Sequence, residues 1–331
     1  MPKPCPPLDA EMRERLEERI GRLHLNLRLG IEADYEARIF GQGRNFFHIE
    51  NWYSAHGLLR GALRLMGLHG RGQRNARAVR VQHNPIMLPR LPEAFDGFRI
   101  LHISDPHLDM AEDMPHALIE AVRGVEYDVC VLTGDFRSKT FGTYAAALTG
   151  MRQVRTYLNG AVYGVFGNHD SIRMLPGLED MDIRMLMNES LVLSRGGASL
   201  HLAGIDDAHY YRADNLEKAM QGIPEQAVSI LLTHSPEIYQ HAAYADFDVM
   251  LCGHTHGGQI CLPGGIPLMC NANSPRAFCR GAWRYQQMQG YTSAGSGACV
   301  VDVRLNCPPE ITVHCLRRGE SLHDASVRAR Q

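Results

Sequence analysis

The sequence predicts an α/β fold with sheets that are buried on both faces, preceded by a helical N-terminal extension. The main observation is that short apolar, β-rich runs alternate with helical stretches from about residue 98 onward. Each run is apolar almost throughout and ends in polar residues, which is typical of a strand covered on both faces. The chain has 331 residues, of which 45% are hydrophobic and 21% charged, so it can bury a substantial core.

The composition excludes several classes of protein. The formal net charge is −2, which gives no basic excess, and no nucleic acid is expected as a ligand. The nine cysteines occur singly and form no C-x-x-C pair, so we expect free thiols in a reducing, cytoplasmic setting. The N-terminus lacks the apolar segment of a signal peptide, and no run approaches the ~18 apolar residues of a membrane-spanning helix.

The first expected element is an amphipathic helix over residues 9–30. Asp9 can cap its N-terminus, and apolar residues then recur at helical spacing. These residues are Met12, Leu16, Ile20, Leu23 and Leu27. Two interpretations fit the pattern: a helix packed on the surface of the domain, or a helix that binds a partner.

Residues 52–80 combine aromatic, apolar and basic side chains. Trp52 and Tyr53 open the segment, and six arginines but no acidic residue lie between positions 60 and 80. A short basic amphipathic helix of this kind can lie on an anionic membrane surface, so peripheral membrane contact is one interpretation. The other interpretation is a helix that covers the core and is followed by a solvated basic loop.

The alternating part of the chain follows an extended linker, which Pro85, Pro89 and Pro92 indicate. Five buried strands are expected there, with the sequences FRILHISD, DVCVLTGD, AVYGVFGNHD, AVSILLTHSP and DVMLCGHTHGG. Helices are expected near residues 112–124, 142–158 and 236–244. Residues 190–205 and 298–316 are typical of antiparallel strand pairs.

Each of the five expected strands ends in residues that can bind a metal ion. In order along the chain these are Asp105 and His107, Asp135, Asn168, His234, and His254 with His256. Sites in open α/β sheets form outside the carboxyl ends of the strands, so one cleft can collect all of them. Seven ligands are too many for one ion with an open position and suit two ions that share Asp135.

The type of donor and the spacing add to this interpretation. A mixed oxygen and nitrogen set without thiolate favours manganese, and iron or zinc after it. The D-x-H and H-x-H spacings fit strand ends, because alternation places residues two apart on the same face.

The five motifs together resemble the calcineurin-like metallophosphoesterase superfamily, whose pattern is D-x-H, G-D, G-N-H-[D/E], H and G-H-x-H. The resemblance implies a four-layer αββα double β-sandwich, here with an N-terminal helical extension. It also implies that Asp105, His107 and His256 hold one metal, that Asn168, His234 and His254 hold the second, and that Asp135 bridges. His169 would face the leaving-group oxygen, Asp170 would orient its ring, and a metal-bridging hydroxide would attack phosphorus in line.

A narrower resemblance covers most of the C-terminal two-thirds. The stretches GHTHGGQI, GYTSAGSG and RLNCPPEITVH look like the bacterial phosphodiesterase branch close to YkuE and YaeI, which is related to UDP-2,3-diacylglucosamine pyrophosphatases. Many members carry an N-terminal membrane anchor, where this chain has the helix of residues 9–30 and the basic segment. We therefore expect an extension over 1–95, a catalytic domain over 96–318 and a polar tail over 319–331.

Three further residues are candidates for substrate contacts. Arg137 and Lys139 directly follow the Asp135 motif, so either can hold a substrate phosphate or form a surface salt bridge. His209 follows another expected strand and either lines the cleft or faces solvent. The Gly/Pro-rich loop over 261–275 is expected at the cleft rim.

The expected function is a dinuclear metal-dependent phosphodiesterase or pyrophosphatase with a small-molecule or lipid-linked substrate. The alternative is a membrane-surface lipid pyrophosphatase of the UDP-2,3-diacylglucosamine type, and a non-catalytic scaffold and a nuclease are further hypotheses. The expected location is cytoplasmic, with peripheral contact to the inner face of the membrane through residues 52–80.

Overall fold

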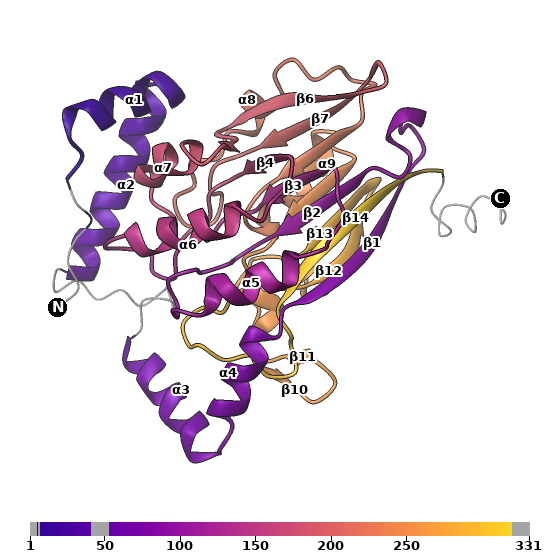
Figure 1. Ribbon diagram of the computed structural model, residues 1–331. Coiled ribbons are helices and arrows are strands. Elements are labelled where there is room, and N and C mark those ends of the chain that lie inside the picture. Colours follow the sequence, from indigo (N-terminus) through magenta and orange to yellow (C-terminus); the bar gives the residue numbers. More distant parts are fainter. Residues whose placement is uncertain (1–4, 6, 41–52, 320–331) are drawn as a thin grey trace.

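The computed structural model describes residue 5, residues 7–40 and residues 53–319, which form two six-stranded sheets and a separate hairpin (Figure 1). The first sheet contains, in spatial order, β1 (Arg80–Leu88), β14 (Glu310–Arg318), β2 (Arg99–Ile103), β3 (Val129–Leu132), β4 (Ala161–Gly164) and β5 (Ile183–Met185). The second contains β12 (Gly281–Tyr285), β13 (Met288–Thr292), β9 (Val249–Cys252), β8 (Ser229–Leu232), β7 (Ala198–Gly204) and β6 (Glu189–Arg195). The hairpin pairs β10 (Cys261–Leu262) with β11 (Ile266–Pro267).

Both sheets are mixed. In the first, β2 to β5 run parallel, while β14 is antiparallel to β2 and parallel to β1. In the second, β7, β8, β9 and β13 run parallel, and β6 and β12 are antiparallel edge strands. The parallel strands β2, β3, β4, β8 and β9 are the five expected from the sequence.

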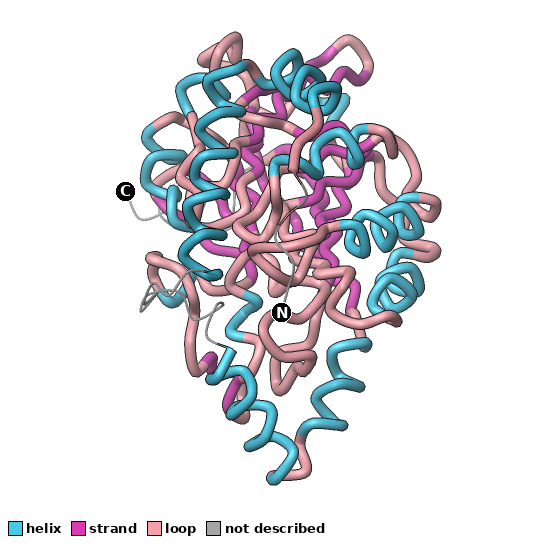
Figure 2. Tube along the Cα trace, turned by 90° about the vertical axis from the view of Figure 1, so that its left-hand side faces the viewer, coloured by secondary structure: helices cyan, strands magenta, loops and turns pink. Residues whose placement is uncertain are grey.

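The core has three main parts, and together they define four layers. One apolar cluster lies between the sheets, with Val131 from the first and Leu232 from the second among its members. A second covers the outer face of the first sheet with α5 (Met114–Val122), α6 (Ala145–Arg155) and α7 (Leu175–Glu179). A third covers the second sheet with α8 (Leu216–Met220) and α9 (Tyr239–Tyr244). The predicted αββα double sandwich is confirmed (Figure 2).

Short 3-10 turns connect several of the strands and helices. They are η2 (Glu93–Phe95), η3 (Ile172–Met174), η4 (Pro236–Ile238), η5 (His256–Gly258) and η6 (Arg276–Phe278). The expected pair over 190–205 is present as β6 and β7, but the expected pair over 298–316 is wrong. Only β14 forms there, because Val301, Val303 and Leu305 bury their side chains in a small cluster with Leu63 instead of joining a sheet.

The N-terminal segment forms two helices where one was expected. Asp9 caps α1 (Ala10–Ile20) by accepting a hydrogen bond from the Met12 N–H at 2.8 Å. Gly21, with φ +84°, ends α1, and α2 (Arg22–Phe40) follows. The change of direction turns Leu23 to solvent, 85% exposed, and buries Leu25 in its place.

The basic segment also forms two helices, α3 (Tyr53–Leu65) and α4 (His69–Arg77), which meet at Gly67 and form the tapered end in Figure 2. Trp52 lies outside the described residues. Residues 80–88, taken from the sequence as part of the extension and linker, form β1 at the edge of the first sheet. Among the described residues, no helix is long and apolar enough to cross a membrane.

The expectation that every cysteine is a free thiol is wrong. Cys270 and Cys279 form a disulfide between the segment after β11 and the turn before β12, while the other seven remain free. Their spacing of nine residues carries no recognisable signal. The chain path brings their Cα atoms to 6.0 Å, which is within the usual range for a disulfide.

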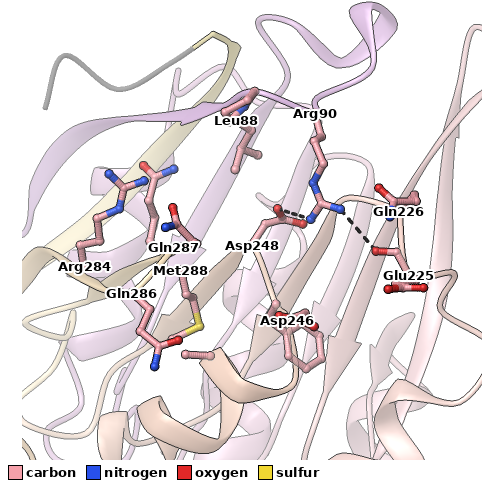
Figure 3. A pocket seen from close by; sticks show the side chains of 14 residues that line it. Leu88, Arg90, Glu225, Gln226, Asp246, Asp248, Arg284, Gln286, Gln287 and Met288 are labelled. Carbon is pink, nitrogen blue, oxygen red and sulfur yellow. Dashed lines mark hydrogen bonds and ion pairs between the residues drawn. The ribbon is translucent and has the colours of Figure 1, made fainter. Parts of the chain in front are cut away.

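A cavity of about 620 Å³ opens at the edge of the sheets where β8 and β9 begin (Figure 3). Two of its charged side chains bind each other, because Arg90 pairs with Asp248 at 2.8 Å, and Arg90 also donates to the Glu225 carbonyl at 3.3 Å. The residues expected to bind metal lie at the opposite edge, where these strands end.

Candidate metal centre

The seven side chains expected to bind metal lie together at one edge of the two sheets. Each follows the C-terminal end of β2, β3, β4, β8 or β9, and none is more than 6% exposed. We call them the ligand cluster: Asp105, His107, Asp135, Asn168, His234, His254 and His256. Because parallel strands end at a common edge, the fold brings together residues from five distant parts of the chain.

The backbone is left-handed at five members of the ligand cluster. The φ angles are +50° at Asp105, +40° at His107, +59° at Asp135, +72° at His254 and +51° at His256. Such angles are uncommon and strained outside glycine, and they concentrate at functional sites. The expected explanation of the D-x-H and H-x-H spacings is therefore wrong. Both motifs begin after their strands have ended, and tight turns bring the side chains together.

One half of the ligand cluster gathers around His256. Nε2 of His256 lies 3.1 Å from Nε2 of His107 and 3.4 Å from Oδ1 of Asp105. Oδ2 of Asp135 lies 3.8 Å from Nε2 of His107.

The other half gathers around the amide oxygen of Asn168. Oδ1 of Asn168 lies 2.9 Å from both Nε2 of His234 and Nδ1 of His254, and those two nitrogens are 3.2 Å apart. Oδ2 of Asp135 lies 3.3 Å from Nε2 of His234. The same Asp135 oxygen thus approaches both halves, as a bridging carboxylate would.

The spacing of the donors fits divalent metal ions. Bonds of about 2.1 Å to nitrogen and oxygen place neighbouring ligand atoms about 3.0–3.4 Å apart around one ion. Most separations in the two halves, from 2.9 to 3.4 Å, lie in or next to that range, and the 3.8 Å between Asp135 Oδ2 and His107 Nε2 is the exception. Burial lowers the pKa of His254 and His256 well below the ordinary value, so both rings are neutral, which is the form that binds metal.

The electrostatics of the ligand cluster favour a positive charge beside Asp135. Burial alone would lower the pKa of His234, but the Asp135 carboxylate outweighs it and raises that pKa to about 10. A bound cation would supply the same positive charge to the buried carboxylate. The donor set and its charge therefore both fit a metal centre.

Hydrogen bonds on the outer side of the cluster orient its rings. The Nδ1 atoms of His107 and His234 lie 2.7 Å from the carbonyls of Arg137 and Thr133, so these nitrogens donate. Each Nε2 therefore faces the centre and is the ring atom that would bind a metal ion, whose charge would replace any proton there.

The carboxylate of Asp105 is supported by a chain of buried polar groups. Ser104 Oγ donates to Asp105, and Thr133 Oγ1 lies 2.7 Å from Ser104 Oγ. His102 Nε2 lies 2.8 Å from Thr133 Oγ1, and its Nδ1 lies 3.2 Å from Nε2 of His314. Burial lowers the pKa of His102 to about 3, so its ring is neutral. His102 and His314 thus extend the support of a ligand into the first sheet.

Two glycines of the motifs are required by close packing. A Cβ on Gly167 would lie 2.7 Å from Nδ1 of His234 and would overlap the Asp135 carboxylate. A Cβ on Gly253 would overlap the side chains of Ser104 and Asp105. The glycines of G-N-H and G-H-x-H therefore leave room for ligands that come from other strands.

His169 faces the ligand cluster without belonging to it. Its Nε2 lies 3.9 Å from Oδ2 of Asp135, and its Nδ1 lies 2.9 Å from the Ser138 carbonyl. Asp170 was expected to orient this ring, but its described hydrogen bonds are with the main chain. The Asp170 carboxylate accepts hydrogen bonds from the backbone N–H groups of Asp135, Phe136 and Gly167 at 2.7–2.9 Å, and so ties together the loops that follow β3 and β4.

Arg137, a candidate for substrate contacts, is buried and bound to main-chain carbonyls. Its side chain is 2% exposed, and its guanidinium donates to the carbonyls of His169, Thr140 and Gly142, which shapes the loop after Asp135. Lys139 is exposed. His209 lies beside the ligand cluster: its ring centroid is 4.2 Å from that of His254, and its Nδ1 is 3.0 Å from Oε1 of Glu237.

The loop after β13 contributes a thiol that the sequence pattern did not reveal. Sγ of Cys299 lies 3.6 Å from Nε2 of His169 and within 4.8 Å of donor nitrogens of His107 and His256. The side chain of Gln259 holds this loop by accepting from the Cys299 N–H and donating to its carbonyl, both at 2.8 Å. The sequence did hold a signal for this loop. The strand β13 runs parallel to β9 and so ends at the same edge of the sheet as the ligand cluster, and the glycine-rich stretch GYTSAGSG spans its end.

A cavity of about 190 Å³ opens in front of the ligand cluster. Asp135, His169, His254 and His256 form its polar wall. Its other walls are largely apolar and include Leu59 of α3, Met269 of the segment after β11, and Cys299 with Val300 and Val301. The basic segment and the Gly/Pro-rich loop therefore both reach the mouth of the metal centre.

The N-terminal helices brace the metal centre from behind. Arg28 of α2 is fully buried, lies 3.2 Å from Asp206 and donates to the Asp170 carbonyl at 3.1 Å. Glu32 accepts from Ser171 Oγ and the Ile172 N–H, both at 2.7 Å. These contacts hold the loop after β4, which carries Asn168 and His169.

Comparisons with known proteins agree with this geometry. A family model described as calcineurin-like phosphoesterase matches residues 98–258, which include the whole ligand cluster. The chain is 30% identical over 257 residues to the uncharacterized metallophosphoesterase YkoQ of Bacillus subtilis (strain 168), covering 74% of this chain and 93% of that protein. Over 242 residues it is 26% identical to the uncharacterized metallophosphoesterase YkuE of the same organism, covering 69% and 82%. It is 27% identical over 234 residues to the phosphodiesterase YaeI of Escherichia coli (strain K12), covering 65% and 81%.

Proposed function

The chain belongs to the calcineurin-like phosphoesterase family, and from this premise we propose that it hydrolyses phosphodiester or pyrophosphate bonds with two divalent metal ions. The observation that carries the proposal is the division of the ligand cluster into two halves that share one oxygen of Asp135. Manganese is the first candidate because the seven side chains of the ligand cluster offer only nitrogen and oxygen donors, and iron and zinc are alternatives because the Cys299 thiol lies beside one half. The choice of a diester is supported by the relative YaeI, which is named a phosphodiesterase.

In this proposal Asp105, His107 and His256 hold one ion, Asn168, His234 and His254 hold the other, and Asp135 bridges. When bound, two such ions polarise the phosphoryl oxygens and lower the pKa of a water molecule, which supplies the nucleophile without a covalent intermediate. The protein contributes the fixed positions of the ligands. The left-handed turns and the outward hydrogen bonds hold these side chains in place before substrate arrives.

We assign to His169 the transfer of a proton to the leaving oxygen. The Ser138 carbonyl accepts from Nδ1, so a proton on Nε2 faces the same space as Asp135. The carbonyl also stabilises the charged form of the ring, which is the form that acts as a general acid. The main-chain N–H of His169 donates to Oδ1 of Asp135 at 2.8 Å, which couples its position to the ligand cluster.

A lipid-linked pyrophosphate of the UDP-2,3-diacylglucosamine type is the narrower alternative. Leu59 and Met269, which line the cavity in front of the ligand cluster, favour a substrate with an apolar part.

The experiment that tests the proposal measures metal content and hydrolysis on the same protein. Metal-stripped protein is reloaded separately with manganese, iron or zinc, its metal content is measured by elemental analysis, and hydrolysis of bis(p-nitrophenyl) phosphate is compared with that of p-nitrophenyl phosphate. Two ions per chain and a preference for the diester are expected. A preference for the monoester contradicts the type of bond, and two bound ions without turnover on either ester or on a nucleotide pyrophosphate favour the scaffold.

A further inference from the structure

Two segments that reach the metal-site cavity, through Leu59 and Met269, expose many large apolar side chains. Fourteen large hydrophobic side chains of the described residues are exposed, and eight of them lie in two segments, residues 58–66 and 262–269. We call these eight the apolar rim: Leu58, Leu59, Leu65, Met66, Leu262, Ile266, Leu268 and Met269. Exposed apolar side chains that gather in this way mark contact with a membrane or another protein.

The two segments of the apolar rim are neighbours in space. Leu63 of α3 is buried against Val301 and Leu305, and the same cluster includes Ile260, which directly precedes β10. Leu59 and Met269, one from each segment, line the cavity in front of the ligand cluster. Figures 1 and 2 show β10 and β11 beside the helical arm of α3 and α4.

The apolar rim is held in a fixed shape. The Cys270–Cys279 disulfide closes the segment behind the β10–β11 hairpin. Arg276 and Arg280 donate to the carbonyls of Pro267 and Gly265 at 2.7 and 3.1 Å, and so fasten the hairpin itself. On the other segment, Arg77 of α4 pairs with Asp302 at 2.5 Å, which attaches the helical arm to the loop after β13. The exposed apolar side chains are therefore presented by anchored backbone.

The charged side chains near the apolar rim are basic, which favours a partner with negative charge. No acidic residue occurs between positions 51 and 92 or between positions 257 and 301. Arg60, Arg64, Arg71 and Arg74 are exposed, and within the described part of the chain none of the four forms an ion pair. Helical spacing places Arg60 and Arg64 on the side of α3 away from Leu58 and Leu65. An apolar face and an opposite basic face on one helix are typical of an amphipathic helix that lies on an anionic lipid surface.

We propose that the apolar rim docks this protein on bilayers that contain anionic lipids, so that the metal-site cavity opens toward the membrane. The same geometry indicates the class of substrate, and this second part of the proposal rests on the proposed function. It is an amphiphilic phosphodiester or pyrophosphate whose acyl part passes Leu59 and Met269 while its phosphorus reaches the ligand cluster.

The docking step is tested by sedimentation of the metal-loaded full chain with sucrose-filled vesicles. Vesicles of phosphatidylcholine alone are compared with vesicles that also contain phosphatidylglycerol. Binding is expected only with phosphatidylglycerol, and it should weaken as salt rises because screening reduces the attraction of the arginines. The variants are Leu58→Asp with Leu65→Asp, Leu262→Asp with Ile266→Asp, and Arg60→Gln with Arg64→Gln.

Each apolar pair should lower the vesicle partition coefficient by about tenfold or more, since each leucine loses most of its transfer free energy. The arginine pair should act only on anionic vesicles. Val192→Asp is the matched control, because Val192 is 51% exposed on β6, far from the apolar rim. Hydrolysis of bis(p-nitrophenyl) phosphate in solution should stay unchanged in all of them, which shows that they are folded.

The substrate class is tested with two diesters that share a leaving group. Hexadecyl p-nitrophenyl phosphate in phosphatidylglycerol vesicles is compared with methyl p-nitrophenyl phosphate in solution. The Leu58/Leu65 variant should lose at least tenfold of its kcat/KM on the hexadecyl ester and none on the methyl ester.

The possible outcomes separate this proposal from the proposed function. Absence of binding to anionic vesicles overturns docking, and so does equal binding by wild type and the aspartate variants. A concentration-dependent dimer that Leu58→Asp dissociates also overturns it, because the apolar rim is then a protein interface. Vesicle binding by protein that hydrolyses neither diester leaves docking in place and removes the phosphodiesterase instead.

Discussion

Replacing His169 by alanine separates proton transfer from metal binding. The ring is the only part removed, and the backbone N–H that donates to Asp135 Oδ1 at 2.8 Å remains. Both halves of the ligand cluster keep their donors, so the variant should bind as much metal as the wild type. What is lost is an Nε2 held 3.9 Å from Asp135 Oδ2 by the bond from Nδ1 to the Ser138 carbonyl.

The magnitude follows from the role of a positioned general acid. Such a group contributes about 10²–10⁴ in rate, or about 2.7–5.4 kcal/mol at about 1.36 kcal/mol per decade. That loss applies only where the leaving oxygen needs a proton. An alkoxide leaving group should therefore show the full loss, whereas p-nitrophenolate, which leaves without a proton, should show less than about tenfold.

The assay compares kcat for glycerophosphoethanolamine, followed by release of the alcohol, with kcat for bis(p-nitrophenyl) phosphate, and metal content is measured on each preparation. His241→Ala, an exposed position on α9, is the control. An equal loss on both substrates would refute acid catalysis by His169. Loss of metal from the alanine variant would refute the separation of His169 from the ligand cluster.

Three other variants test particular parts of the structure. Arg28→Met leaves the buried Asp206 carboxylate without the guanidinium that lies 3.2 Å from it, so the free energy of unfolding measured in urea should fall by about 3–5 kcal/mol. Arg22→Met is the control, because Arg22 is exposed and its loss should change the free energy of unfolding little. Equal effects of the two substitutions would contradict the buried pairing. Gly253→Ala places a methyl group against the Asp105 carboxylate, so elemental analysis should find about one ion fewer per chain; an unchanged metal content would show that the site relaxes. Cys299→Ser removes a thiol, a soft donor, that lies within 4.8 Å of donor nitrogens of His107 and His256. When the variant is loaded from an equal mixture of zinc and manganese, the ratio of bound zinc to bound manganese should therefore be lower than in the wild type. An unchanged ratio would show that the thiol does not reach the metal.

The sequence was sufficient where the information is local. The apolar runs that form β2, β3, β4, β8 and β9 specify buried strands through their composition, and the polar residues at their ends identify the ligand cluster. The cap at Asp9 is also local, because it depends on a side chain and an N–H three residues apart. The break at Gly21 was missed, since a helical pattern of apolar residues continues across it and only the packing of Leu25 selects the bend.

The roles of individual site residues were harder to predict because they depend on partners from other segments. Arg137 follows a ligand and looks suited to a phosphate, yet its donors are used by carbonyls of two neighbouring loops. Asp170 follows His169 in the motif but accepts from the loop after β3. Neither arrangement is encoded in spacing along the chain.

The sequence by itself determined the α/β alternation, the ligand residue types and the basic, acid-free character of residues 60–80, because each of these is a property of a short stretch. Only the tertiary structure decided that Asp135 lies between the two halves of the ligand cluster, that Cys299 faces them and that Cys270 meets Cys279. It also decided that two distant segments form one apolar rim at the cavity. These are contacts between strand ends and loops far apart in the chain, and their geometry is fixed by how the two sheets pack rather than by any local pattern.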